Sequence, residues 1–319
     1  MDDRAPDDDT VATALALALR APSRCNLQPW RWQIAAGGVH LHLGRTRSLP
    51  VTGGDQRAEL LGCGAALHHL SVAFAALGWA TIVHRMPSSD NPDHLAAVTA
   101  VARRPTEQDI ALSAAITRRR SDRRNYSDWI APPGYLGLLT ERAAAMGAVI
   151  RPLRDRSGGR RVIEPRAATQ RWAGGYAVGH PGSDVLGDAL AYHTPFPWTE
   201  DVTTEPEMTR SAPPGWTAGP DHADVLVLAT PSDDRLAQLR AGEAMSAVLL
   251  TATNIGLATC PLSAPLDSAD RRLQLRHDVF DDSAHPQIVL RVGQAPDGAD
   301  LSPITPRRSL AEALFPVHA

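Results

Sequence analysis

The sequence predicts an α+β protein built from two related halves, and three observations lead to this prediction. Short segments in which apolar and polar residues alternate, such as 30–35 and 39–44, are typical of strands. Longer segments rich in alanine and leucine, such as 58–77 and 234–254, are typical of buried helices. The first of these helices, with the strand expected after it, recurs 178 residues later in the chain.

The repeat aligns residues 63–83 with residues 241–261 without a gap. Five of the 21 aligned positions are identical, and they include the glycine pairs Gly64/Gly242 and Gly78/Gly256. Alanine-rich composition accounts for some of these identities, whereas glycines at a fixed spacing favour internal duplication. We therefore expect a first half at residues 10–104 and a second half at residues 105–319.

The first half is expected to open with a helix that Asp9 or Thr10 caps and that Pro22 ends. The glycine pair at 37–38 supplies the turn of a hairpin, and Gly78 stops the long helix. The expected elements are, in order, a helix ending near 19, strands at 30–35 and 39–44, a helix at 58–77 and a strand at 80–84.

The second half is expected to begin with a helix that Thr106 caps and that runs into the arginine-rich segment 118–124. The further elements are a helix at 131–146, a strand at 224–229, a helix at 234–254, an extended segment at 256–262 and a strand at 287–293. Residues 155–222 hold two glycine pairs and eight prolines with weak periodicity, which indicates a long insertion or cover.

Composition excludes several classes of function. The 319 residues carry a net charge of −3, which favours neither nucleic acid nor an anionic membrane as a partner. All 32 basic residues are arginine, so neither a Schiff-base lysine nor the lysine of a nucleotide-binding P-loop is present. Cys25, Cys63 and Cys260 are widely spaced without a Cys-x-x-Cys motif, which indicates a reducing compartment and no structural zinc.

The N-terminal region predicts an intracellular protein. Five of its first nine residues are aspartate and one is arginine, so the segment is acidic, which is the wrong charge for a signal peptide. No apolar run approaches the roughly 18 residues that a membrane span requires. We therefore expect a cytoplasmic protein with no membrane contact.

The most informative segment is 20–32, in which a helix stops at a proline and polar residues crowd before a strand. Ser23, Asn26 and Gln28 on such a turn suit a planar, polar, phosphorylated ligand. The alternative is a helix C-terminal turn whose polar side chains satisfy loose backbone groups. The sequence alone leaves both interpretations open.

Two further segments are candidates for ligand binding. In 118–124, five arginines surround Ser121 and Asp122 at a helix end and could hold a phosphate monoester together with Arg307 and Arg308, although such a run is often a solvated face. In 256–263, small residues would let the backbone lie against a ring, although an ordinary helix–strand connection looks the same. His68 and His69 are expected to face different sides of a helix and to be structural.

Four motifs carry a resemblance to a known family. The pattern Ala-Pro-Ser-x-x-Asn-x-Gln-Pro-Trp at 21–30 resembles the flavin-binding turn of nitroreductases, and Arg-Arg-Ser-Asp-Arg at 119–123 resembles their phosphate-binding motif. Residues 256–262 resemble the family's Gly-Leu-x-x-x-Pro-Ile segment, and Val-Gly at 292–293 with Pro-Arg-Arg-Ser-Leu at 306–310 resembles its C-terminal motif. Together they span residues 20–315.

The order of the motifs is reversed relative to ordinary family members, in which the arginine motif comes first and two subunits share each site. With the internal repeat, this order resembles the twin-type, Acg-like branch, in which one chain mimics the family homodimer. The resemblance therefore implies one FMN site per chain, assembled from both halves. It also places a lid at about 155–222.

The resemblance implies that Ser23 and Asn26 contact the isoalloxazine ring or the ribityl chain, with Gln28 close by. Backbone groups of Leu262 and Ser263 would face the flavin N5 region. No catalytic side chain and no metal is expected. The complete set of cofactor-binding residues implied in this way is Ser23, Asn26, Gln28, Arg119, Ser121, Arg123, Pro261, Leu262, Ser263 and Arg307.

The implied function is two-electron reduction of a nitroaromatic, a quinone or a similar flat acceptor by NAD(P)H through FMN. An alternative is a protein that stores or sequesters FMN beneath a lid with little or no turnover. A third interpretation is an arginine-rich binder of a phospholigand or RNA without flavin. The chain is expected to be a monomeric pseudo-dimer or a weak homodimer.

Overall fold

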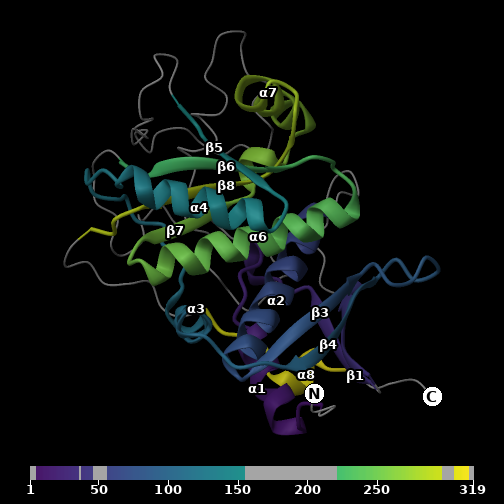
Figure 1. Cartoon of the computed structure of the whole chain (residues 1–319). Helices are drawn as coiled ribbons and strands as arrows, with labels where there is room; N and C mark the ends of the chain where they lie inside the picture. The colour runs from purple at the N-terminus through teal and green to yellow at the C-terminus, as the bar shows by residue number, and fades with distance from the viewer. Residues whose placement is uncertain (1–4, 36, 46–55, 155–220, 297–304, 316–319) are drawn as a thin grey trace, which may run out of the picture.

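The computed structural model describes residues 5–35, 37–45, 56–154, 221–296 and 305–315. Two long helices, α2 (Arg57–Ala76) and α6 (Arg235–Asn254), cross at the centre of the molecule. One four-stranded sheet lies on the far side of each helix, so that the two helices separate the sheets (Figure 1). The architecture is thus α+β, as expected from the sequence.

The first half contains α1 (Asp8–Ala18), β1 (Trp30–Ala35), β2 (Gly38–Leu43), α2, β3 (Trp79–Arg85) and β4 (His94–Ala102). Its strands pair antiparallel in the order β1-β2-β4-β3. The expected cap of α1 was wrong: the side chain of Asp7, not of Asp9 or Thr10, accepts a hydrogen bond, which the Thr10 N–H donates at 2.8 Å. The strand β4 was not expected.

The second half contains α3 (Glu107–Arg118), α4 (Pro133–Ala145), β5 (Val149–Pro152), β6 (Asp224–Thr230), α6, β7 (Ala258–Leu262), η3 (Ala264–Leu266), α7 (Ala269–Phe280), β8 (His285–Gly293) and the C-terminal α8 (Leu310–Ala313). Thr106 caps α3 as expected, in a reciprocal capping box with Asp109. The sheet order is β5-β6-β8-β7, which repeats the order of the first sheet. Residues 155–220, where the lid was expected between β5 and β6, lie outside the described residues.

The crossing of α2 and α6 is reciprocal. An added Cβ atom on Gly64 would lie 2.9 Å from the Gly242 Cα atom, and one on Gly242 would lie 2.9 Å from the Gly64 Cα atom. Each would also clash with a backbone oxygen, that of Leu239 for Gly64 and that of Leu61 for Gly242. Gly64 and Gly242 are 178 positions apart, and so are Leu61 and Leu239. An approximate two-fold axis at the crossing therefore relates the two copies of the sequence repeat. The duplicated fold is confirmed, and the boundary at 104/105 stays a prediction.

The helix α2 corrects one expectation from the sequence. By length and composition it is apolar enough to cross a membrane. However, most of the helix is buried inside the protein, as in the core helix of a globular domain. Its apolar side chains therefore contact α1, α3, α6 and the first sheet.

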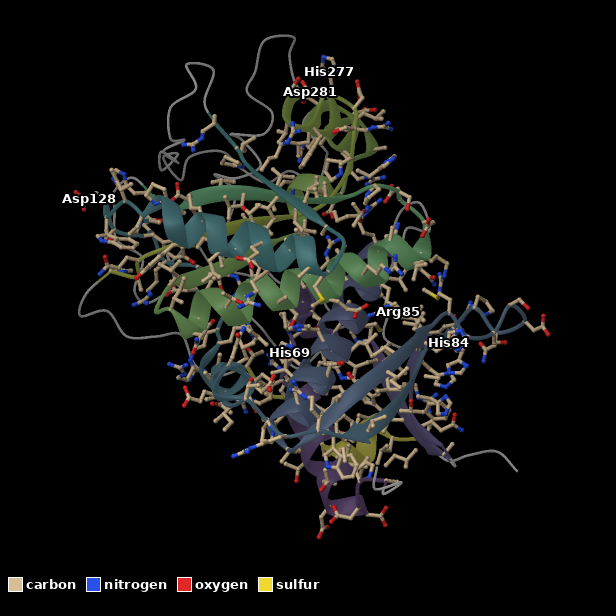
Figure 2. All side chains as sticks on the ribbon, in the orientation of Figure 1. His69, His84, Arg85, Asp128, His277 and Asp281 are labelled. Carbon is tan, nitrogen blue, oxygen red and sulfur yellow. The ribbon has the colours of Figure 1, made fainter. Side chains whose placement is uncertain are left out.

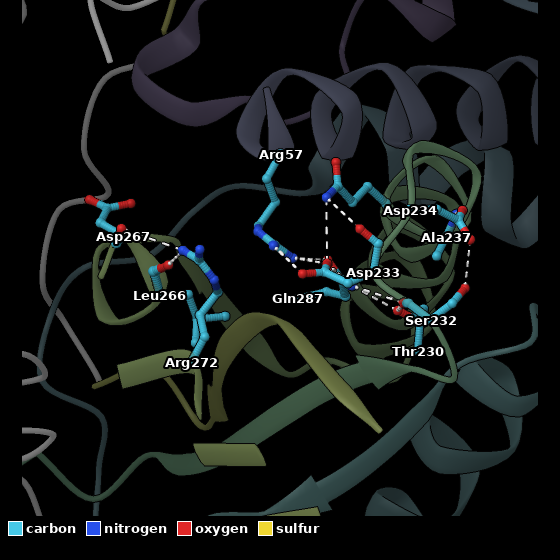
Figure 3. Close-up of polar contacts among 11 residues, drawn as sticks. Arg57, Thr230, Ser232, Asp233, Asp234, Ala237, Leu266, Asp267, Arg272 and Gln287 are labelled. Carbon is cyan, nitrogen blue, oxygen red and sulfur yellow. Dashed lines mark hydrogen bonds and ion pairs between the residues drawn. The ribbon is translucent and has the colours of Figure 1, made fainter. Parts of the chain in front are cut away.

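The two halves are also joined by polar side chains (Figure 3). Arg57 at the start of α2 forms a bidentate ion pair with Asp233, at 2.7 and 2.8 Å, and donates to the amide oxygen of Gln287 in β8. Arg85 in β3 forms a second bidentate pair with the buried Glu243 in α6, at 2.6 and 2.7 Å. These ion pairs flank the glycine crossing and fix the orientation of one half against the other.

Candidate cofactor-binding site

The turn between α1 and β1 is strained and closely packed. Cys25, Asn26 and Gln28 have φ values of 47°, 50° and 51°, a region that residues other than glycine seldom adopt. The Ser23 hydroxyl holds the turn by accepting a hydrogen bond from the Gln28 N–H at 2.9 Å. Gly62 of α2 lies beneath it, since an added Cβ atom there would be 3.2 Å from the Ser23 Cβ atom. Backbone strain of this kind is typical of ligand-binding segments.

The C-terminal tail of the chain packs on this turn. The Asn26 side-chain amide donates to the Pro306 carbonyl at 2.9 Å, and the Arg308 N–H donates to the Gln28 side-chain oxygen at 2.8 Å. The Arg308 guanidinium donates to the carbonyls of Gln28 and Trp30 at 3.3 and 3.2 Å. The two amides predicted from the sequence thus position the tail of the second half against the turn of the first. The residue between Pro306 and Arg308 is Arg307.

For the FMN site that the motifs imply, Asn26→Ala is expected to weaken FMN binding about tenfold, because it removes the hydrogen bond that fixes Pro306 and with it the position of Arg307. Titration of flavin fluorescence with the apoprotein measures the affinity. Asn91→Ala, in an exposed loop of the first half, is the matched control and should leave the affinity unchanged. Equal affinities of both variants and the wild type would remove Asn26 from the site.

The predicted phosphate-binding motif after α3 runs along the free edge of β7. Ser121 forms an isolated parallel bridge with Thr259, and the Asp122 N–H donates to the Thr259 carbonyl at 2.9 Å. The Asp122 carboxylate accepts hydrogen bonds from Arg124, and its carbonyl accepts one from the Tyr126 hydroxyl at 2.9 Å. The Arg124 guanidinium is therefore bonded to a carboxylate of the protein, whereas the backbone of Ser121 lies against the edge strand β7.

The other predicted residues on this side belong to β7 and its continuation. Pro261 and Leu262 lie in β7, and Ser263 follows directly. The Ser263 carbonyl accepts the N–H of Leu266 at 2.9 Å, which starts the short helix η3. Arg123 lies close enough to Cys260 to act on the pKa of its thiol, which burial raises. The motif at 119–123 and the segment 261–263 are therefore neighbours.

An ion pair joins this group to the turn of the first half. Arg24 forms two hydrogen bonds of 2.8 Å with the Asp267 carboxylate. Arg272 of α7 donates to the carbonyl of Leu266 at 2.7 Å and supports the same loop (Figure 3). Bidentate arginine–carboxylate pairs are geometrically specific, so the distance between the turn and the segment after β7 is fixed.

Three arginines meet without an acid between them. Arg119 is almost fully buried, and its Nε and Nη1 atoms have no hydrogen-bond partner; the Nε atoms of Arg20 and Arg307 are likewise buried and unpartnered. Their remaining hydrogen bonds go to backbone carbonyls, from Arg20 to Thr117 and from Arg307 to Thr305. Within the described residues, none of the three guanidinium groups forms an ion pair.

The electrostatics of this arginine cluster are unfavourable without an anion. Burial, together with the positive charges of Arg307 and Arg20, lowers the pKa of Arg119 to about 9. Burial and Arg20 also lower the pKa of Arg307. Guanidinium groups ordinarily remain charged at any physiological pH, and a buried, unpaired charge is costly. The chemistry of Arg20, Arg119 and Arg307 would therefore suit an anion with several acceptor oxygens.

His69 on α2 lies beside the arginine cluster. It is fully buried, its Nε2 atom has no partner, and the charges of Arg119 and Arg307 act on it. The expectation that His68 and His69 face different sides of the helix was wrong: the Nδ1 atoms of both contact the Ser246 hydroxyl, at 2.8 and 2.9 Å. A serine on α6 lies between the two rings, so the histidines converge on it.

A protein of Mycobacterium tuberculosis strain H37Rv, "Putative NAD(P)H nitroreductase Rv3131", is 41% identical to this chain over 97% of this chain and 92% of its own length. The chain belongs to the nitroreductase family. The nitroreductase named Acg in the same strain is 34% identical over 100% of this chain and 99% of its own length, which confirms the Acg-like branch.

A solved structure from Anabaena variabilis, described as "a putative nitroreductase", has the same fold over 92% of this nitroreductase-family chain and 90% of its own, with a TM-score of 0.52 and 9% identity. No family model matches the chain. The nitroreductase fold expected from the motifs is thus confirmed by whole-length relatives and by a distant structure.

The structure places the ten predicted residues in two linked groups. The first group surrounds the turn and the tail and consists of Ser23, Asn26, Gln28 and Arg307. The second lies along β7 and consists of Arg119, Ser121, Arg123, Pro261, Leu262 and Ser263. Their roles in flavin binding stay predictions. Sequence reasoning missed Arg20, which directly precedes the first motif, and His69, for which the sequence carries no signal.

Proposed function

We propose that this chain is an FMN-dependent NAD(P)H oxidoreductase that holds one FMN between its two halves and reduces nitroaromatic, quinone or similarly flat acceptors. The observation that carries the proposal is the arginine cluster. A phosphate monoester brings a charge of about −2 and three acceptor oxygens, which match the unpartnered donors of Arg20, Arg119 and Arg307. The names of the relatives support the nicotinamide donor and the nitro acceptor.

The remaining predicted residues fit the other parts of the cofactor. Ser121 and Arg123 lie beside the arginine cluster along β7 and would add to the phosphate contacts. Ser23 and Asn26 lie on the strained turn, where they would contact the ribityl chain or the ring. The backbone of 261–263 lies at the edge strand of the second sheet and just beyond it, where it would lie against a ring.

FMN, when bound, supplies the two-electron chemistry. The residues of this chain would bind and orient it: the arginine cluster would hold the phosphate, and the pair of Arg24 with Asp267 links the turn to the segment after β7. The burial of Arg119 would help to exclude water from the phosphate end. No side chain is assigned the role of an acid or a base.

The structure favours one cofactor per chain rather than two. In the first half, eleven residues, 19–29, connect α1 to β1 and form the turn, whereas in the second half only 146–148 connect α4 to β5. The position equivalent to His69 in the repeat is Ala247. The two-fold axis therefore relates the scaffolds but not the polar groups of the site.

The proposed activity is tested by adding NADPH or NADH anaerobically to the FMN-loaded chain and recording the oxidised-flavin absorbance. We expect at least one nicotinamide to bleach the flavin and a nitroaromatic or a quinone to restore its colour. A flavin that both donors leave oxidised would contradict the oxidoreductase and favour the FMN-storage alternative.

A further inference from the structure

The hydrogen bonds of His69 define which of its nitrogens can meet a ligand. Its Nδ1 atom lies 2.9 Å from the Ala65 carbonyl oxygen and 2.9 Å from the Ser246 hydroxyl. A carbonyl can only accept, so the hydrogen of the neutral ring resides on Nδ1 and Nε2 carries a lone pair. The ring lies in the interior of the molecule on α2, and Figure 2 labels it.

The Nε2 atom of His69 is buried and has no hydrogen-bond partner. The charged and titratable groups that act on it are His68 on the same helix, Arg119 after α3 and Arg307 in the C-terminal tail; the side chain facing it from α6 is the neutral Ser246. Burial and these charges hold the pKa of His69 well below 6.5, so the ring is neutral in the free protein. The buried acceptor on His69 and the buried donors of Arg119 and Arg307, whose charges act on it, thus all remain unpartnered.

A phosphate placed among these donors would meet the lone pair of Nε2 with an oxygen lone pair. That contact is repulsive unless one proton lies between the two atoms. We propose that His69 Nε2 takes up a proton from solvent when the dianionic phosphate of the flavin binds and then donates a hydrogen bond to a phosphate oxygen. The inference rests on the proposed FMN site and adds a charged fourth group to the arginine cluster.

The proton balance determines the direction in which the affinity for FMN changes with pH. Near pH 7 the free phosphate is mainly a dianion, because its second pKa is about 6, and His69 is neutral. The complex holds one more proton than its separated parts, so affinity for FMN falls as pH rises, by up to about tenfold per unit. Riboflavin lacks the phosphate, so its affinity should not change with pH in this way.

The experiment is calorimetric titration of the apoprotein, as the full chain, with FMN at pH 7 in two phosphate-free buffers of different ionisation enthalpy. The difference between the two observed binding enthalpies, divided by the difference between the ionisation enthalpies of the buffers, gives the number of protons taken up. Wild type is expected to take up between one half and one proton. His69→Gln, whose amide can donate without titrating, should take up none and bind FMN about tenfold more weakly, with riboflavin affinity unchanged.

His68→Gln is the matched control, since this buried neighbour also contacts Ser246 and should keep the uptake. A wild type that binds FMN without proton uptake would overturn the proposal. A His69→Gln variant that still takes up the proton would also overturn it, as would one whose affinity for riboflavin falls as much as its affinity for FMN. If His69→Gln does not fold, the wild type alone tests the proposal: proton uptake with FMN but not with riboflavin supports it, and equal uptake with both ligands overturns it. Failure to bind FMN at all would instead contradict the proposed function.

Discussion

Gly242→Ala is expected to destabilise the whole chain by about 3 kcal/mol, which corresponds to a fall in the unfolding temperature of roughly 6–12 °C. The added methyl group would clash with the Leu61 carbonyl oxygen and lie 2.9 Å from the Gly64 Cα atom. Both neighbours are backbone atoms, so no side chain can rotate away and the two helices must separate. Thermal unfolding followed by circular dichroism measures the effect.

Gly137→Ala is the matched control for this substitution. Gly137 lies in the helix α4, it is exposed, and an added Cβ atom there would meet nothing within 4 Å. Alanine should therefore stabilise the chain by about 0.5–1 kcal/mol through its better helix propensity. A Gly242→Ala protein as stable as the wild type would contradict the close crossing of the two halves.

Arg119→Met is expected to weaken FMN binding about 100-fold while leaving the apoprotein at least as stable as the wild type. The residue supplies two buried, unpartnered N–H groups, and a phosphate that loses this partner loses a desolvated charge contact. In the apoprotein the same change removes a buried cation whose pKa is already lowered by Arg307 and Arg20. Binding is measured by titration and stability by chemical unfolding without flavin.

The neighbouring Arg118→Met is the control, because Arg118 is exposed in the last turn of α3 and should affect neither quantity. Riboflavin provides the matched ligand, since its affinity should be the same for Arg119→Met and wild type. An apoprotein that Arg119→Met destabilises strongly, with FMN affinity unchanged, would show that Arg119 supports the fold and not a phosphate.

The sequence predicted the scaffold where its patterns were long and regular. The helices α2 and α6 were recognisable because their apolar residues extend over five turns, and the repeated glycines marked the point at which they cross. The strand β4 was missed because four of its nine residues are alanine, which favours helix over strand. The helix α7 was missed because five of its twelve residues are charged and it buries only Leu275 and Phe280.

The candidate site was predictable in its motifs but not in its contacts. Asn26 and Gln28 were found as polar residues on a turn, yet nothing local indicates that they hold the tail near Arg307. The pKa of Arg119 is lowered by Arg20 and Arg307, which come from opposite ends of the chain, so its sequence neighbours do not reveal the cluster. The surroundings of His69 come from both halves of the chain, including Ser246, Arg119 and Arg307, so only the folded structure reveals them.

The stoichiometry of FMN binding tests the central claim most directly. The account predicts that the full-length apoprotein binds one FMN per chain, because the turn, the tail and the arginine cluster meet only once in the described structure. Quantitative titration, with flavin and protein concentrations determined independently, gives this number. A value of one agrees with a single site built from both halves, whereas two per chain, or none, would contradict it.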